Sequence, residues 1–255
     1  MILAGAVTGL IVGVTGVGGG ALMTPLLLLV FGIAPHAAIG TDLWYAAITK
    51  VAAARVHHGH DLIDWPIVTR MWMGSLTASA ATVLWMRTQA DGGTSVEWLR
   101  AVIAVAVCLT AIGMLFSVPL TALGKRFDTQ RYRSWQAPLT VGFGAAIGVL
   151  VTLTSVGAGA LGAICLLYLY PNRLTPARLV ATDIAHAIPL AVVAGVGHLT
   201  LSNVDGRLLL NLIAGSIPAA LIGAKLSARM PHTRLRMLLA LVLLFVGLQL
   251  LRSSW

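Results

Sequence analysis

A few ionisable side chains inside long apolar segments are the residues of this chain best suited to chemistry. Asp42 and Asp183 each follow a threonine, and Lys50 comes eight residues after Asp42. That spacing is roughly two helical turns, so Asp42 and Lys50 fall along one face of a helix. Charges in apolar surroundings are costly and face a partner or a polar site. The three side chains therefore predict a buried site that binds a charged solute or relays protons.

The composition places these side chains in a lipid membrane. Of the 255 residues, 58% are hydrophobic and only 10% are charged, and the mean hydropathy is +0.91. Soluble domains carry about a quarter charged residues. The net charge of +9 is spread over short connections, which excludes a basic nucleic-acid-binding domain and favours a role in membrane orientation. We therefore predict an all-α polytopic membrane protein whose partner is the lipid bilayer, with no nucleic acid.

The chain nearly repeats itself, without gaps, 141 positions later. The repeated residues are Gly16, Gly18, Pro35, Thr41, Asp42, His57, Asp64, Gly74 and Ser75, which recur as Gly157, Gly159, Pro176, Thr182, Asp183, His198, Asp205, Gly215 and Ser216. Matching glycine-interrupted segments in two halves of a membrane chain are typical of transporters, with the site at the interruptions. We therefore predict a first transmembrane repeat (1–120), a basic cytoplasmic linker (121–137) and a second transmembrane repeat (138–255).

The first apolar segment of each half is too long for one crossing, and glycines cut it in the middle. In the first half each piece has about 13 residues, or about 20 Å of helix, against a hydrocarbon core of about 30 Å. Two such pieces predict a broken or re-entrant helical hairpin, followed in each half by three transmembrane helices, or about eight to ten membrane segments in all. Re-entry would gather the basic connections on one side of the membrane, whereas a single crossing would split them. Each half then makes an odd number of crossings, which predicts inverted repeats and alternating access.

Glycines at the two breaks are predicted to bind the substrate. They are Gly18, Gly19, Gly20, Gly157 and Gly159. Glycine lets the backbone turn tightly and leaves its N–H groups uncovered. A helix that starts after such a turn directs its positive end toward a cavity, which suits an anion. The alternative is close packing of helices through small residues.

Polar residues of the next helix in each half are predicted to line the same site. They are Thr41, Asp42, Thr182 and Asp183. Each pair lies almost two turns after the proline that begins its helix. The structural alternative is that each aspartate ties down N–H groups of the adjacent half-helix.

Lys50 is predicted to be an asymmetric anchor for a negatively charged substrate. Its equivalent in the second half is Ala191, so the fold does not need a lysine in both copies. A charge at this depth faces a cavity or a partner. The alternatives are a structural pair with Asp42 and snorkelling of the lysine to the interface.

Five residues are candidates for proton coupling. They are Asp42, Asp183, His186, His57 and His198. Histidine changes charge near neutral pH, so it can serve as a titrating gate or relay. For His57 and His198 the alternative is an interfacial hydrogen bond to a nearby carboxylate. The second copy has too few histidines to supply the ligands of a metal site, so we expect no metal. We also expect no cofactor, and no catalytic residue because the chain offers no nucleophile–base pair.

These motifs give the chain a resemblance to the TauE/SafE family of sulfite exporters and related membrane permeases. The resemblance rests on GVTGVGGGALMTPLLLL, on P-x(5)-T-D ending at Asp42, and on K-x(6)-H-x-G-x(4)-D-W starting at Lys50. A weaker second copy contains SVGAGALGA, TPARLVATD and H-x(6)-D, and it has Leu161 opposite Gly20. Together the two copies cover essentially the whole chain.

The resemblance implies a secondary transporter of small sulfur-containing or organic anions, such as sulfite, sulfoacetate or related sulfonates. It also implies export and a prokaryotic cell (inner) membrane location. The sequence contains no P-loop string GxxxxGK[ST], so nothing in it indicates transport driven by nucleotide hydrolysis. The absence of a nucleotide-binding motif favours secondary transport coupled to a proton gradient, or uniport of the anion. An anion channel of the same architecture remains an alternative, as does a cation or metal transporter that uses Asp42, Asp183 and the histidines. The substrate, the direction of transport and the oligomeric state stay open, with a homodimer as one alternative.

Overall fold

Helices account for most of the chain in the computed structural model, which describes residues 2–15, 20–56, 62–89, 96–117, 130–227 and 232–253. The helices are α1 (Ile2–Thr15), α2 (Gly20–Leu29), α3 (Pro35–Val56), α4 (Trp65–Gln89), α5 (Val96–Leu115), α7 (Gln130–Thr154), α8 (Ala160–Leu169), α9 (Pro176–Thr200), α10 (Gly206–Ser227) and α11 (His232–Ser253). These described ranges contain no strand. The predicted all-α polytopic class is confirmed.

Four of the helices contain stretches that are long and apolar enough to cross a membrane, judged by length and composition within the described ranges. They lie in α5, α7, α9 and α10. Three predicted site residues, Gly18, Gly19 and His57, lie outside the residues that the structure describes. α7 begins at Gln130, so part of the range 121–137 predicted as a linker is helical.

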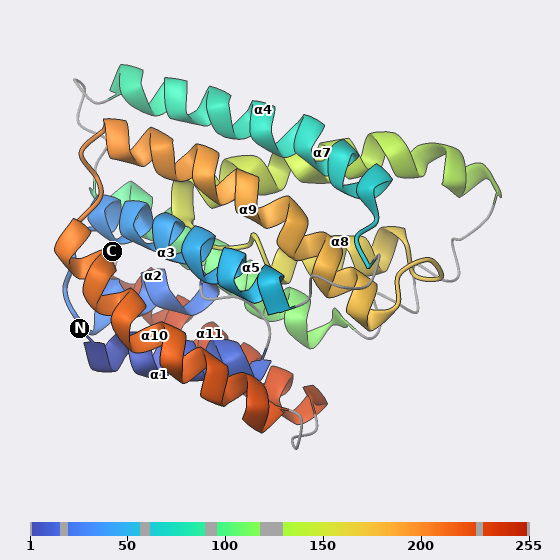
Figure 1. Cartoon of the computed structure of the whole chain (residues 1–255). Helices are drawn as coiled ribbons and strands as arrows, with labels where there is room; N and C mark the ends of the chain where they lie inside the picture. Colours follow the sequence, from blue (N-terminus) through green and yellow to red (C-terminus); the bar gives the residue numbers. More distant parts are fainter. Residues whose placement is uncertain are drawn as a thin grey trace.

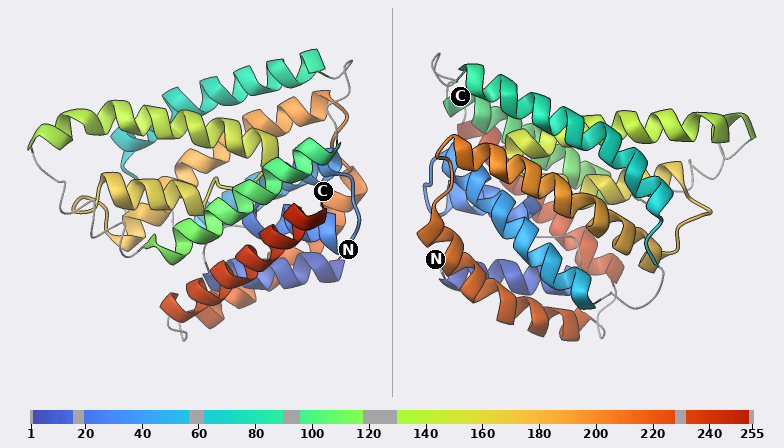
Figure 2. Two further views of the ribbon diagram at one scale, coloured as in Figure 1. Left: turned by 180° about the vertical axis from the view of Figure 1, so that it is seen from behind. Right: turned by 45° about the horizontal axis from the view of Figure 1, so that its top comes forward.

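The helices lie in three layers with a further pair behind them (Figure 1). α4 packs against α7 on one side, α1 packs against α10 on the other, and α3 and α9 lie between these pairs. α5 and α11 lie side by side behind the layers, as the view from the opposite side shows (Figure 2). The first and last layers are tightly packed, since a Cβ built at Gly74 or Gly215 would lie 2.0 Å from the carbonyl oxygen of Val141 or Ile2.

Hydrogen bonds between the halves join residues that are related by the sequence repeat. The backbone N–H of Asp64 donates to Thr182 Oγ1 at 3.1 Å, and the backbone N–H of Asp205 donates to Thr41 Oγ1 at 3.1 Å. The start of α3 therefore lies beside the connection that follows α9, and the start of α9 lies beside the connection that follows α3. The two central helices run antiparallel as a result.

The repeat contains a gap that the sequence comparison missed. A Cβ built at Gly9 in α1 would lie 2.4 Å from the carbonyl oxygen of Ser216, and one built at Gly148 in α7 would lie 2.3 Å from that of Ser75. Ser75 and Ser216 are 141 positions apart, whereas the two glycines are 139 positions apart. The prediction of a gapless repeat is therefore wrong for the first helix of each half, and the extra two residues of the second half lie at or near its break.

α7 and α8 form a hairpin whose two outer ends lie together. Near the start of α7, Gln136 Nε2 donates to the carbonyl oxygen of Leu169 at 2.8 Å, and Thr140 Oγ1 lies 2.7 Å from the Tyr170 hydroxyl. The chain thus runs along α7, reverses at residues 155–159 and returns along α8. α8 has 10 residues, but α7 has 25 and is long enough to cross a membrane, so equal short arms are not found in this half.

Candidate functional site

The break between α7 and α8 turns through two residues with positive φ. The φ angles are 60° at Ser155 and 112° at Gly157, the left-handed region that costs a side-chain-bearing residue roughly 1–2 kcal/mol. The backbone N–H of Val156 donates to Thr154 Oγ1 at 3.1 Å, which satisfies one donor inside the turn. The sequence predicted a break here, and the structure places it at residues 155–159.

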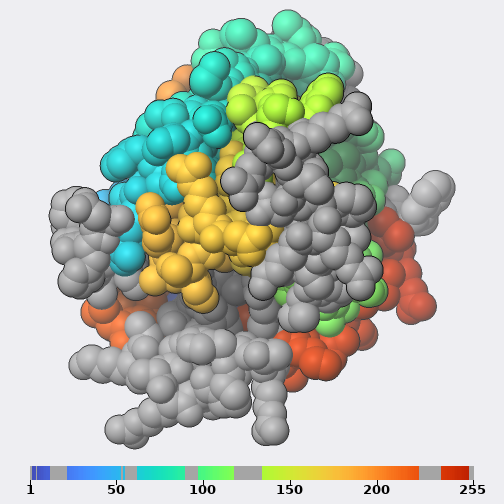
Figure 3. Space-filling view, turned by 90° about the vertical axis from the view of Figure 1, so that its right-hand side faces the viewer, coloured from blue at the N-terminus to red at the C-terminus, as the bar shows by residue number. Residues whose placement is uncertain are grey.

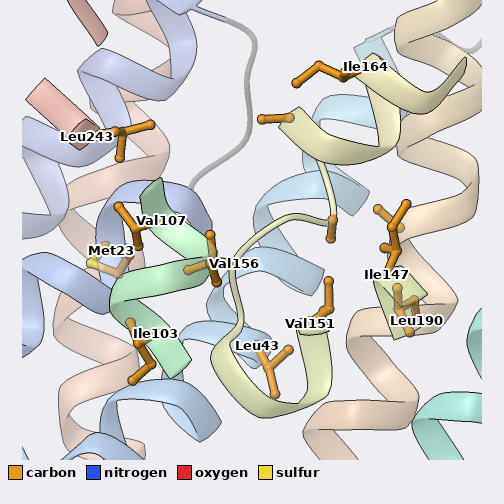
Figure 4. Close-up of a cluster of buried hydrophobic side chains, with 14 of the residues drawn as sticks. Met23, Leu43, Ile103, Val107, Ile147, Val151, Val156, Ile164, Leu190 and Leu243 are labelled. Carbon is orange, nitrogen blue, oxygen red and sulfur yellow. The ribbon is translucent and has the colours of Figure 1, made fainter. Parts of the chain in front are cut away.

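Apolar side chains close one side of this break. Val156 is fully buried and lies in a cluster that includes Val107 of α5, Leu43 of α3 and Val151 of α7 (Figure 4). The opposite side of the break faces the polar residues of α3 and α9 that are described next. The turn is therefore embedded in protein rather than exposed, which is the condition for irregular backbone at membrane depth.

Gly159 precedes the first turn of α8, and no side chain caps the helix there. The N–H of Gly162 donates to the carbonyl oxygen of Gly157 at 3.2 Å, and the N–H of Ala163 donates to that of Gly159 at 3.0 Å. A helix start without a side-chain cap keeps its positive end available to an anion or to a carboxylate.

Lys50 reaches this break from the other half of the molecule. Its Nζ donates to the carbonyl oxygen of Ala158 at 3.5 Å and lies 3.9 Å from Asp183 Oδ2. Lys50 is 7% exposed and Asp183 is 6% exposed, so the ion pair is buried. The alternative of a structural pair between Lys50 and Asp42 is wrong, because the lysine pairs with the equivalent aspartate of the second half.

Asp42 has neutral partners instead of a cation. It is fully buried, and its Oδ2 accepts a hydrogen bond of 2.5 Å from Thr24 Oγ1 on α2. The Ser155 hydroxyl of the break lies beside this carboxyl. Asp42 Oδ1 and Ser155 Oγ both lack a hydrogen-bond partner among the described residues. Thr24 of the adjacent short helix therefore contacts Asp42 through both its hydroxyl and its backbone N–H, so the alternative that this aspartate ties down N–H groups of the half-helix stays open.

Asp183 lies against α8 where that helix has no side chain. A Cβ built at Gly162 would lie 2.3 Å from Asp183 Oδ1, so only glycine leaves room for the carboxyl. This oxygen has no hydrogen-bond partner in the part of the chain that the structure describes. The residue of α8 equivalent to Thr24 is Cys165, whose thiol is a weak donor.

Thr41 and Thr182 hold the connections between helices. Their hydroxyls accept the backbone N–H groups of Asp205 and Asp64, as described above. Both threonines are fully buried. The structure therefore engages these two predicted site residues in contacts between the halves, one helical position away from the carboxyls.

The two described histidines of the site have different partners. His186 Nε2 lies 2.9 Å from Ser75 Oγ, and its Nδ1 has no partner among the described residues. His198 Nε2 donates to the carbonyl oxygen of Thr152 at 2.8 Å, and its Nδ1 lies 3.5 Å from Asn203 Nδ2. His186 therefore has an available ring nitrogen one helical turn after Asp183 on α9, whereas both nitrogens of His198 are engaged.

No group of three or more His, Cys, Asp or Glu side chains lies close enough to hold a metal ion within the described ranges. The carboxyls of Asp42 and Asp183 have different neighbours, and the nearest charged group to Asp183 is a lysine. A cation beside that ammonium group would be repelled.

Sequence reasoning missed three residues of the site. They are Thr24, Ser155 and Cys165. Thr24 and Cys165 are 141 positions apart, so the repeat contained a signal for that pair. Nothing local marked Ser155, whose importance depends on a carboxyl more than 100 positions away in the sequence.

A helical protein with long apolar helices, a broken hairpin and buried ionisable groups beside the break has the architecture of a membrane transporter. The family model described as "Sulfite exporter TauE/SafE" matches residues 1–250. The chain belongs to this family of membrane transporters and is a multi-pass membrane protein, which confirms the resemblance predicted from the sequence.

Two relatives from Bacillus subtilis (strain 168) are similar along nearly their full length. The chain is 36% identical over 256 residues to "Probable membrane transporter protein YjnA", covering 98% of each chain. It is 29% identical over 244 residues to "Probable membrane transporter protein YdhB", covering 95% of this chain and 96% of that one. No solved structure matches the chain significantly.

Proposed function

We propose that this protein is a secondary transporter of small sulfur-containing or organic anions, such as sulfite, sulfoacetate or related sulfonates. The family description names sulfite export, and the bacterial relatives favour a prokaryotic cell membrane as its location. Export is the proposed direction. The transported anion is proposed to bind at the break between α7 and α8, close to Lys50.

The position of Lys50 is the single observation that carries this proposal. A buried ammonium group at the start of α8 adds its charge to the positive end of that helix. Both features attract an anion, and both lie where the backbone is interrupted. The transporters that bind solutes near the bilayer midplane use interrupted helices in the same way.

Alternating access between two inverted repeats is the proposed mechanism. It is supported by the antiparallel course of α3 and α9 and by hydrogen bonds that recur between repeat-related residues. Lys50 and the break it reaches belong to different halves. A rocking motion of one half against the other would therefore rearrange the site itself.

An ion pair between the halves supports a closed gate at one end of the molecule. Arg173 donates to both oxygens of Asp64 at 2.7 and 2.8 Å, and Arg178 lies 3.8 Å from the same carboxylate. The space-filling view shows the connection between α8 and α9, in yellow, beside the start of α4, in cyan (Figure 3). The residues equivalent to the two arginines are Gly32 and Ala37, so this ion pair has no counterpart at those two positions of the first half.

The test is uptake into proteoliposomes with sulfite, thiosulfate, sulfoacetate, sulfate and small carboxylates, with and without a pH gradient. Lys50→Ala should lower anion affinity by about 30- to 100-fold, since losing a buried charged contact costs about 2–3 kcal/mol. The matched control is Arg87→Ala, because Arg87 is exposed and its one side-chain hydrogen bond within the described ranges goes to Thr200. Equal affinity in both variants would contradict the proposed site.

The same vesicles separate a transporter from an anion channel. A transporter should give saturable flux and counter-transport of preloaded anion. Currents that rise in proportion to voltage, without counter-transport, would favour the channel. A metal-dependent gain in thermal stability that is lost in Asp42→Asn would favour a cation or metal transporter.

A further inference from the structure

We infer that Asp183 is an internal substitute for the transported anion, and that the anion takes its place on Lys50 only when Asp183 binds a proton. This inference rests on the proposed function, because it takes Lys50 as the anchor of the anion. The co-transported ion is then the proton, and Asp183 is the one carboxyl among the candidates that couples the proton to the anion.

The pair between Lys50 and Asp183 leaves donors of the ammonium group without an acceptor among the described residues. At 3.9 Å the two groups form an ion pair without a hydrogen bond, since even the weak hydrogen bond from Lys50 to Ala158 is shorter, at 3.5 Å. The hydrogen bond of Lys50 Nζ goes to the carbonyl oxygen of Ala158 instead. An ammonium group has three donors, so an oxyanion can bind Nζ without displacing that carbonyl.

The charge of Asp183 depends on Lys50. Asp183 Oδ1 has no hydrogen-bond partner among the described residues, and Gly162 offers it no side chain. The position that supplies a hydroxyl donor to Asp42 is a cysteine in this half, Cys165. Among the described residues, Lys50 is therefore the one group that strongly stabilises the ionised form of Asp183.

Charge balance then links the anion to a proton. With an anion on Lys50 and an ionised Asp183, two negative charges would share one positive charge in a buried site. An uncompensated buried charge costs several kcal/mol. A proton taken up by Asp183 from the side to which the site is open removes that cost, and its O–H can then donate to the anion. When the anion leaves, the proton leaves with it and Asp183 pairs with Lys50 again, so one proton moves with each singly charged anion.

His186 is placed to pass this proton. It lies one helical turn after Asp183 on α9, and its Nδ1 has no partner among the described residues. The other titratable or charged groups near Asp183 are Lys50 from α3 and Cys165 from α8. Asp42 lies on α3 with Thr24 and Ser155 as its hydrogen-bonding neighbours, and it forms no ion pair with this lysine among the described residues.

The experiment measures binding of methanesulfonate, whose single charge is constant between about pH 6 and pH 8. In the wild type, once Asp183 is ionised, the affinity should fall about tenfold for each pH unit, and each bound anion should take up one proton from weakly buffered solution. Asp183→Asn should bind the anion at least as tightly, without this pH dependence or proton uptake. In vesicles its transport should no longer respond to a pH gradient.

Five outcomes would decide between this inference and its alternatives. A pH dependence in Asp183→Asn equal to that of the wild type would overturn it, as would a wild type that binds methanesulfonate without taking up a proton. Asp42→Asn should keep the pH dependence, and its loss there instead would assign the coupling to Asp42. Wild-type affinity in Lys50→Ala, or no binding of methanesulfonate by the wild type, would contradict the proposed anion site itself. The proton uptake of the wild type needs no variant, so misfolding of Asp183→Asn would not remove the test.

Discussion

Asp42 and Asp183 occupy equivalent positions in the two halves, but their surroundings differ in kind. Asp42 accepts a hydrogen bond from Thr24 and has no cation within salt-bridge distance among the described residues. Asp183 faces the ammonium group of Lys50, and a cysteine replaces the threonine. Neutral donors thus stabilise the Asp42 carboxyl, whereas a positive charge stabilises that of Asp183. Only the second carboxyl has a cation for which a transported anion could compete.

The contacts that build the scaffold are the same in both halves. Tyr45 lies 2.5 Å from Ser216, and His186, its equivalent, lies 2.9 Å from Ser75. The two threonine hydroxyls that hold the connections likewise form equivalent hydrogen bonds. The two copies therefore share their packing and diverge at the residues around the carboxyls.

The largest effect in this comparison is expected from Gly162→Ala. The new Cβ would lie 2.3 Å from Asp183 Oδ1 and force the carboxyl away from its position opposite Lys50. Overpacking a buried site costs about 1–3 kcal/mol, so transport should fall by about 5- to 150-fold. The equivalent residue of the first half is already an alanine, Ala21, and Ala21→Gly is the matched control. Wild-type uptake by Gly162→Ala would show that the carboxyl does not need this position.

A smaller effect is expected from removing the donor to Asp42. Thr24→Ala would take away the hydrogen bond to a buried carboxyl and should destabilise the protein by about 1–3 kcal/mol. The matched variant Cys165→Ala removes a much weaker donor and should cost less than about 1 kcal/mol in hydrogen bonding. Thermal unfolding in detergent measures both. Equal losses of stability would contradict the difference drawn between the two carboxyl sites.

The smallest effects are expected where the halves are alike. Thr182→Val would leave the N–H of Asp64, a buried residue, without its acceptor, at a cost of about 1–2 kcal/mol. Thr41→Val should cost about 0.5–1 kcal/mol, because Asp205 is exposed and its N–H can turn to water. Unfolding midpoints of the two variants rank these costs, and a larger loss in Thr41→Val would reverse the expected order.

Local sequence rules predicted the start of the crossing helices well and the size of the broken hairpin less well. Pro35 and Pro176 begin α3 and α9 as expected, since the fixed φ of proline suits a first helical turn. The length of α7 was underestimated because its first residues are polar and resemble a linker. The two-residue shift between α1 and α7 was missed because the repeated residues that set the offset begin at Gly16, after the end of α1.

Hydropathy, the repeat and the residue types of the sequence were enough to determine a helical membrane protein with breaks and buried charges. They did not determine the partner of Lys50, because either Asp42 or Asp183 satisfied the same rules of charge and depth. The antiparallel packing of α3 on α9 decided it by bringing a lysine of one half to the break of the other. Contacts between residues more than 100 positions apart depend on how helices pack, and no local pattern encodes that choice.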